Sequence, residues 1–263
     1  MVYHHESFFF IVAIRYHHYI LLQFYNFIIG AGQVFLITKK RGRVNIFLDT
    51  AHVPTITAWV ETGLLSGVTT NPTHLSKEGG DIQKLIKEIC AVIGPTGDVS
   101  VEVTEHDAER VYEQAKNIAR LGNNVVVKIP CHKDYYAVIK RLVAEGVPIN
   151  ITLVFTLTQG LMMCLLGVKY ISPFVGRLDD TGADGIELLY QLRAMVDQYQ
   201  FSTQILAASI RDVHHLMSAI QAGADVATVP PAVLEKAVAH PLTDSGMAQF
   251  NADWAKLGIK RFF

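Results

Sequence analysis

The fold prediction rests first on the heptapeptide NVVVKIP, residues 124–130. Its valines and isoleucine form an apolar run that only Lys128 interrupts, without the regular polar alternation of a strand that faces water on one side. Such a run predicts a strand covered on both faces, as in a parallel sheet. Lysine is almost never fully buried unless it is paired or has a function. The stretch therefore indicates a parallel sheet and marks one amine within it as unusual.

Similar apolar runs recur along the chain, with amphipathic stretches between them. The other candidate strands are residues 45–50, 67–72, 99–104, 148–152, 170–174, 204–209 and 225–230. Helical patterns cover residues 81–94, 107–122, 135–146 and 185–200, and several helical stretches end in glycine, at Gly94, Gly122, Gly146 and Gly223. Glycine after the last helical residue is a common stop signal. Strands and helices that alternate in this way predict an α/β fold.

Eight β/α units in residues 45–263 predict a single domain with the TIM (β/α)8 barrel fold. A doubly wound open sheet is the alternative, and it would place a glycine-rich turn after its first strand. The turn here, DTAHVP, contains no glycine. One extra helix is predicted over residues 244–258. Its Met247, Phe250 and Trp254 share one face and pack either on a neighbouring subunit or on the barrel itself.

Residues 1–44 differ in composition from the rest and are interpreted as an N-terminal extension. They are rich in Phe, Tyr, Ile and His, and polar residues such as Arg15 interrupt every window of about 20 residues that a membrane span needs. The basic cluster follows the apolar part, unlike that of a secretory signal. We expect this segment to be disordered, or to be upstream DNA translated from too early a start codon, with Val44 as the true start. A weak membrane anchor is the alternative.

The composition excludes several classes of partner. The net charge is −1, so no nucleic-acid-binding surface is expected. The three cysteines, Cys90, Cys131 and Cys164, are widely spaced and odd in number, which suits a reducing compartment and predicts a cytoplasmic protein. No His, Cys or Asp spacing indicates a metal site, and we expect neither metal nor cofactor.

Polar residues gather where the predicted strands end, which in a barrel is the catalytic rim. These candidates for catalysis and substrate binding are Asp49, Thr70, Asn71, Glu102, Lys128, Asn150, Thr152, Ser172, Arg177, Ser209 and Arg211. Singly, such residues often cap helices or form turns. Because seven strands would bring them to one rim, we expect them to share one cavity.

The buried lysine has a chemical explanation in this setting. A desolvated ammonium loses its proton more easily, and the neutral amine can attack a carbonyl to form a Schiff base. Asp49 and Glu102 are suitable proton carriers for that chemistry. A structural ion pair between Lys128 and either carboxylate is the alternative. Arg177 and Arg211 would hold an anionic substrate tail, and the helix after Ser209 would favour a phosphate.

A set of motifs resembles a known family over residues 45–258. They are FLDT, GVTTNP, VEV, VVVKIP, INIT, QGL, SPFVGR and LAAS followed by IR. Together they resemble the transaldolases, in particular the small-subunit group that also contains the fructose-6-phosphate aldolases. The resemblance implies that Lys128 forms the Schiff base and that Asp49 is the general acid and base. It assigns the catalytic water to Glu102 and Thr152, substrate hydroxyls to Asn71 and Asn150, the donor site to Ser172, and phosphate to Arg177, Ser209 and Arg211.

Four positions favour the transaldolase branch of this family. The aldolase branch has Gln in place of Glu102, Tyr in place of Phe174 and a small residue in place of Ser172, and it lacks Asn150. A tyrosine hydroxyl helps to order water that protonates the enamine after cleavage, and phenylalanine lacks that group. The resemblance therefore implies transfer of a dihydroxyacetone unit from sedoheptulose 7-phosphate to glyceraldehyde 3-phosphate, in the pentose phosphate pathway.

Two other functions remain open from the sequence. One is fructose-6-phosphate aldolase activity, which releases free dihydroxyacetone. The other is a catalytically silent, membrane-tethered barrel that binds sugar phosphates, for which residues 1–44 are the only support. The resemblance also implies a homodecamer built from rings through the C-terminal helix.

Overall fold

The computed structural model describes residues 29–30, 33–34 and 44–258. The chain divides into two units, residues 1–42 and 43–263. In the first unit, β1 (Ile29–Gly30) and β2 (Gln33–Val34) pair antiparallel. Most of residues 1–44, on which the expectation of disorder or early translation rests, lie outside the described part. The extension therefore stays a prediction.

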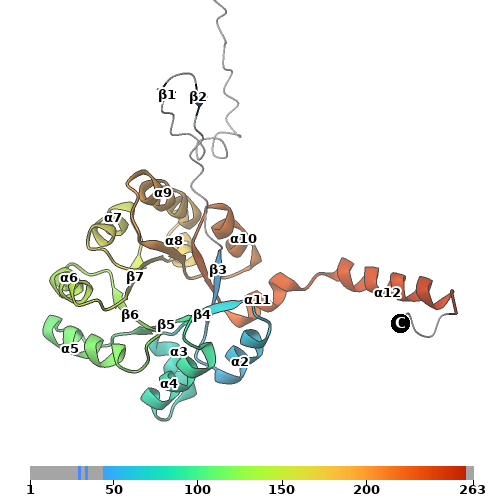
Figure 1. The fold of residues 1–263 in the computed structure, drawn as a ribbon, viewed down its shortest axis with the longest axis horizontal. Helices are drawn as coiled ribbons and strands as arrows, with labels where there is room; N and C mark the ends of the chain where they lie inside the picture. Colours follow the sequence, from blue (N-terminus) through green and yellow to red (C-terminus); the bar gives the residue numbers. More distant parts are fainter. Residues whose placement is uncertain (1–28, 31–32, 35–43, 259–263) are drawn as a thin grey trace, which may run out of the picture. The chain divides into compact units, whose positions relative to one another are not determined.

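The second unit contains a closed barrel of eight parallel strands, which confirms the predicted α/β barrel (Figure 1). The strands follow each other around the barrel in chain order, and β10 closes it by pairing with β3. A doubly wound open sheet is therefore wrong. The strands are β3 (Asn45–Asp49), β4 (Leu65–Thr69), β5 (Asp98–Glu102), β6 (Val125–Pro130), β7 (Ile149–Val154), β8 (Tyr170–Pro173), β9 (Gln204–Ala207) and β10 (Val226–Val229).

Helices connect the strands and form a ring around the barrel (Figure 1). Aspartates at N-cap positions begin several of them: Asp81, Asp107 and Asp184 each accept a hydrogen bond from a first-turn amide. The helices are α2 (Val53–Glu61), α3 (Pro72–Glu78), α4 (Ile82–Ile93), α5 (Ala108–Ala119), α6 (Tyr136–Ala144), α7 (Leu157–Leu165), α8 (Val175–Asp179), α9 (Gly185–Gln198), α10 (Val213–Gln221), α11 (Pro231–Val238) and α12 (Pro241–Ala255), with a 3-10 helix η1 (Lys133–Tyr135) before α6.

Three of the four glycines predicted to end helices do so. Gly94, Gly146 and Gly223 have φ values of 76°, 77° and 82°, a conformation that glycine adopts without strain. Gly122 is different, because α5 already ends at Ala119. A Cβ atom at Gly122 would lie 2.9 Å from the sulfur of Cys90, so close packing explains this glycine better than a helix stop.

Strand β6 shows how the barrel separates its core from its site. Val125, Val127 and Ile129 belong to the large apolar cluster between the strands and the helices. Val126 points the other way, into a small cluster composed of strand residues inside the barrel. Side chains two positions apart in a strand share a face, so Lys128 also points into the barrel, above Val126. The apolar run is therefore explained by the outer face, and the lysine by the inner one.

The extra C-terminal helix α12 presents its apolar residues to solvent. Met247 is 58%, Phe250 74% and Trp254 38% exposed, and no residue of the helix is buried. Packing of this stripe on the chain's own barrel, one of the two alternatives, is therefore not what the structure shows. None of the helices in the described part of the chain is long and apolar enough to span a membrane.

Candidate active site

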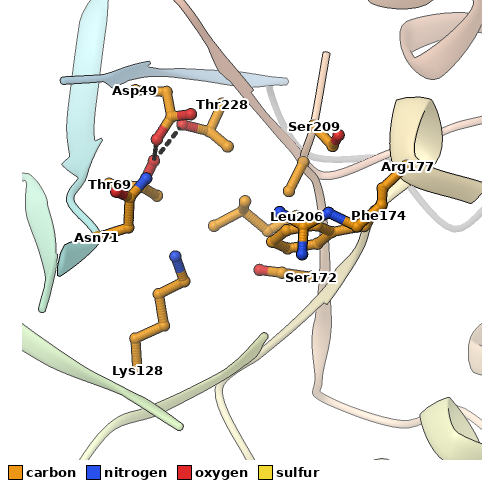
Figure 2. A pocket seen from close by; sticks show the side chains of 11 residues that line it. Asp49, Thr69, Asn71, Lys128, Ser172, Phe174, Arg177, Leu206, Ser209 and Thr228 are labelled. Carbon is orange, nitrogen blue, oxygen red and sulfur yellow. Dashed lines mark hydrogen bonds between the residues drawn. The ribbon is translucent and has the colours of Figure 1, made fainter. Parts of the chain in front are cut away.

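A pocket of about 140 Å³ opens among the carboxyl ends of the barrel strands. Ligand pockets for drug-sized molecules are larger, about 300–1,000 Å³, so this one suits a few-carbon polar unit. Figure 2 shows the Lys128 amine directed into it, between Asp49, Thr69 and Asn71 on one side and Ser172 and Phe174 on the other. The pocket is lined by Asp49, Thr69, Asn71, Lys128, Ser172, Phe174, Arg177, Leu206, Ala208, Ser209 and Thr228.

Lys128 is buried to 6% exposure and reaches the pocket from β6. Its Nζ lies 2.9 Å from Oε2 of Glu102, which stands beside it on β5, and donates to the carbonyl oxygen of Thr70 at 3.3 Å. The ion pair that the sequence left as an alternative is therefore present in the unliganded chain. It does not conflict with a reactive amine, because the same carboxylate can accept the proton that the amine must lose.

Glu102 also lines a second, larger hollow on the outside of the barrel. This groove has a volume of about 790 Å³, and its lining residues come largely from α3, α4 and α5, among them Ile86, Gln114 and Ile118. The Glu102 side chain keeps 15% of its surface exposed. This carboxylate therefore lies between the groove and the lysine.

Asp49 ends β3 and is held by two threonines that are not among the predicted site residues. The Thr69 hydroxyl donates to Oδ1 of Asp49 at 2.7 Å, and the hydroxyls of Thr69 and Thr228 lie 2.5 Å apart (Figure 2). Nδ1 of His74 lies 3.7 Å from the same carboxylate oxygen. Asn71 caps α3, and its Nδ2 lies 3.3 Å from the same His74 nitrogen. Asp49 thus has a fixed orientation at the pocket wall.

A buried hydrogen-bond chain supports Ser172. The Asn150 amide nitrogen donates to Ser100 Oγ at 3.1 Å, and the Asn150 amide oxygen accepts from the Ser172 hydroxyl at 2.6 Å. Asn150 therefore lies behind the pocket wall and positions Ser172, which lines it. Thr152 is buried to 1% exposure, and its hydroxyl has no hydrogen-bond partner among the described residues. A buried polar atom of this kind commonly serves a ligand or water.

The far end of the pocket carries the candidates for anion binding. Arg177, on α8, lies over the ring of Phe174 at 5.0 Å, and Ser209 lines the pocket with a positive φ of 59°. Arg211 does not line the pocket, because it forms a two-point ion pair with Asp180. This guanidinium holds the pKa of the Asp180 carboxyl below its ordinary value.

One expectation about this end stays a prediction. The sequence predicts that Ser209 lies near a helix N-terminus that would favour phosphate. The helix α10 begins only at Val213, and the Asp212 carboxylate caps it by accepting from the His215 amide at 2.8 Å. A negative charge already occupies that helix end, and Arg177 and Ser209 are the predicted anion-binding residues that line the pocket.

The structure thus brings six of the predicted site residues to the pocket wall besides Lys128: Asp49, Asn71, Ser172, Phe174, Arg177 and Ser209. Thr70, Glu102, Asn150, Thr152 and Arg211 lie behind or beside it. Thr70 turns its hydroxyl to the Ser100 carbonyl, because strand β4 ends at Thr69 and places Thr69 inward instead. Side chains two positions apart in a strand share a face, so Thr69 could have been predicted from Asn71. No such signal marks Thr228, which is a single hydroxyl residue in the otherwise apolar strand β10.

The cysteines lie outside the pocket wall. Burial raises the pKa of the Cys90 and Cys131 thiols to about 11, and it also raises the pKa of Cys164. Thiols of this kind are poor nucleophiles near neutral pH. In the part of the chain that the structure describes, no three His, Cys, Asp or Glu side chains gather as metal ligands.

The fold and the pocket together define a TIM-barrel protein with a buried lysine–carboxylate site at the catalytic rim. The chain belongs to the transaldolase/fructose-6-phosphate aldolase family, whose family model matches residues 46–260. It is 47% identical over 211 residues to a "probable transaldolase" of Lactiplantibacillus plantarum, covering 80% of this chain and 96% of that one. A "probable transaldolase" of Chelativorans sp. is 46% identical over 217 residues, covering 82% and 99%.

Solved structures with little sequence identity share the fold alone. A mandelate oxidase matches with a TM-score of 0.52 at 12% identity, over 72% of this chain and 64% of that chain. A flavocytochrome b2 matches with a TM-score of 0.52 at 11% identity, over 72% and 56%.

Proposed function

We propose that this chain is a transaldolase that moves a dihydroxyacetone unit from sedoheptulose 7-phosphate to glyceraldehyde 3-phosphate through a Schiff base on Lys128. The observation that carries the proposal is the buried Lys128 amine, which faces the pocket with Glu102 at 2.9 Å and has Asp49 across the cavity. The names of the relatives support the reaction class.

The first half of the reaction forms the imine. Glu102 takes a proton from the Lys128 ammonium, and the neutral amine attacks the ketone carbon of the donor sugar. The carbinolamine then loses its hydroxyl as water, which needs a proton. The partnerless hydroxyl of buried Thr152 is suited to hold that water together with Glu102.

The second half breaks and forms the carbon–carbon bond. Asp49 removes the proton from the C4 hydroxyl of the donor, the C3–C4 bond breaks, and its electron pair moves into the protonated imine to give an enamine. The aldehyde product leaves, and the enamine carbon attacks the acceptor aldehyde while Asp49 returns the proton to its oxygen. Arg177 and Ser209 would hold the phosphate at the pocket mouth.

Transfer rather than release is favoured by Phe174. Its ring lines the pocket, meets the ring of Phe155 edge to face at 6.0 Å, and lies under Arg177. The ring provides no hydroxyl to order a water that would protonate the enamine. The enamine is therefore expected to persist until the acceptor arrives.

Borohydride reduction in the presence of fructose 6-phosphate tests the proposal. The expected result is a covalent adduct that adds one reduced dihydroxyacetone unit to the peptide containing Lys128. Failure to trap it in the wild-type chain would reject the enzyme and leave a sugar-phosphate-binding barrel, and full activity of Lys128→Ala would reject Lys128 as the residue that forms the Schiff base. Dihydroxyacetone release as fast as transfer would identify an aldolase. Activity after EDTA treatment tests the expected independence of metal.

We propose further that copies of this chain assemble through α12, and that the assembly is a decamer, as the resemblance implies. The exposed stripe of Met247, Phe250 and Trp254 supports an interface, since contiguous apolar surface of this kind commonly marks one. Native mass spectrometry of the full chain and of Phe250→Glu tests this. Assembly that survives the charge would contradict the role of α12. Cytoplasmic location and a place in the pentose phosphate pathway belong to the same proposal.

A further inference from the structure

Three oxygen atoms from three neighbouring strands are joined by two hydrogen bonds at the pocket wall. Thr228 on β10, Asp49 on β3 and Thr69 on β4 belong to strands that are adjacent in the closed barrel. The hydroxyls of Thr228 and Thr69 lie 2.5 Å apart, and that of Thr69 lies 2.7 Å from Oδ1 of Asp49 (Figure 2). Both threonines are buried, at 3% and 2% exposure. The two threonine side chains are therefore largely shielded from bulk water.

Counting hydrogens fixes the direction of the chain. Each hydroxyl has a single hydrogen to donate. The hydrogen of Thr69 goes to the Asp49 carboxylate, so in the pair of threonines it is Thr228 that donates to Thr69. The bond from Thr228 to Thr69 then strengthens the bond from Thr69 to the carboxylate, as hydrogen bonds in series do at low dielectric. Removing the Thr228 hydroxyl would weaken the hydrogen bond from Thr69 to Asp49 without changing any atom of Asp49.

The two oxygens of Asp49 are used differently. Thr69 donates to Oδ1, and the ring of His74 on α3 stands 3.7 Å from the same atom. No hydrogen bond reaches Oδ2 from any of the described residues. The other charged groups that face the pocket are Lys128 on β6 and Arg177 on α8. A carboxylate held by one oxygen presents the other in a fixed direction, which is what proton transfer requires.

We propose that Thr228 is a positioning residue, which acts through Thr69 to hold Asp49 with Oδ1 occupied and Oδ2 presented to the substrate. The inference rests on the proposed function, in which Asp49 carries the proton. As the carbon–carbon bond breaks, the proton of the donor hydroxyl passes to Oδ2 while Oδ1 continues to accept from Thr69. The same proton returns from Oδ2 to the acceptor oxygen in the second half of the reaction.

Thr228→Val removes the hydroxyl at nearly constant volume, and Thr228→Ser keeps the hydroxyl and removes the methyl group. The loss of one neutral hydrogen bond in the chain is expected to lower kcat by about tenfold. The KM for fructose 6-phosphate is expected to stay within about twofold. The pH profile of kcat is expected to differ from that of the wild type, because the hydrogen bond that holds the carboxylate becomes weaker. Thr228→Ser is expected to keep most of the wild-type kcat.

Thr203→Val is the matched control. Thr203 is also buried, at 2% exposure, but its hydroxyl donates to the Val168 carbonyl and it does not line the pocket. It is expected to lose stability and to keep the wild-type pH profile. The inference is overturned if Thr228→Val has the wild-type kcat and pH profile, if Thr228→Ser is as impaired as the valine variant, or if Thr203→Val shows the same kinetic loss.

Borohydride trapping separates this inference from the proposed function. With dihydroxyacetone in place of fructose 6-phosphate, Thr228→Val is expected to form the Lys128 adduct at the wild-type level, since imine formation does not use the Thr228 hydroxyl and no carbon–carbon bond has to break. Absence of the adduct in the wild-type chain would overturn both the proposed function and the role of Thr228. A normal wild-type adduct with unaltered kinetics in Thr228→Val would overturn the role of Thr228 alone. If the valine variant does not fold, Thr228→Ala compared with Thr228→Ser decides the question by the same readouts.

Discussion

Replacing Lys128 with Met and Glu102 with Gln, singly and together, is expected to show that the two charges stabilise each other in the free protein. Their Nζ and Oε2 atoms are 2.9 Å apart, and their side chains are only 7% and 15% exposed. A double-mutant cycle isolates the energy of this pair from the separate effects of each substitution. It also tests the charge of the lysine, because a neutral amine would couple weakly to the carboxylate.

The magnitude follows from the geometry. At 2.9 Å and an effective dielectric constant of about 20, the Coulomb attraction is about 6 kcal/mol before desolvation is subtracted. Removing one partner of a buried pair usually destabilises a protein by about 3–5 kcal/mol. Glu102 also reaches the outer groove, so the lower end applies, and Lys128→Met is expected to lower the free energy of unfolding by about 3 kcal/mol. The free energy of unfolding of the double variant is expected to lie about 2 kcal/mol above that of Lys128→Met.

Urea denaturation at pH 7 with matched m-values measures the cycle. The pair Lys116 and Glu145, whose side chains are 31% and 33% exposed, is the control and is expected to couple by less than about 1 kcal/mol. Both variants that lack Lys128 are also expected to be inactive. A coupling energy below about 0.5 kcal/mol between Lys128 and Glu102 would refute the reasoning, since the amine would then not be held as a charged partner.

Four further outcomes are expected. Phe174→Tyr is expected to raise dihydroxyacetone release relative to transfer severalfold, because its hydroxyl would order a protonating water, and an unchanged ratio in a coupled assay would contradict this. Asp180→Asn releases Arg211 from its ion pair and is expected to lower the KM for phosphorylated donors by about threefold with little change in kcat, whereas a higher KM would count against it. Burial raises the pKa of Cys90 and Cys131 to about 11, so their labelling by a thiol reagent is expected to accelerate about tenfold per pH unit above neutrality. Since the unfolded thiols ionise near pH 9, the free energy of unfolding is expected to fall as the pH rises from about 9 to about 11. A flat stability profile over that range would contradict the cause given for these shifts.

The barrel could be predicted because its signals are local. Each strand has an outer face that must be apolar, and its run of Val and Ile is visible without any knowledge of partners, as in residues 125–130. Helix ends were less certain. Gly146 follows α6 in a left-handed conformation, whereas Gly122 serves close packing against Cys90, and the two glycines look alike in the sequence.

The candidate site was predicted in part, because the identity of a polar residue does not reveal which neighbour it contacts. Lys128 and Asp49 were found from their positions in strands. The predicted strand ends three residues later than β4 does, at residue 72 and not at Thr69, which selected Thr70 in place of Thr69. The pair of Arg211 and Asp180 joins segments 31 residues apart, and only the path of the connecting loops brings them together.

The two apolar clusters of the barrel have a consequence for protein engineering. The large outer cluster, between strands and helices, contains most of the buried apolar side chains, while the small inner one lies beneath the pocket. Successive positions of one strand therefore serve different purposes: Val127 packs in the outer cluster and stabilises the fold, while Lys128 points into the barrel and forms part of the site. A designer who rewrites the inward positions at the rim to accept new donors and acceptors can leave the outward positions untouched, so substrate range and folding can be varied nearly independently.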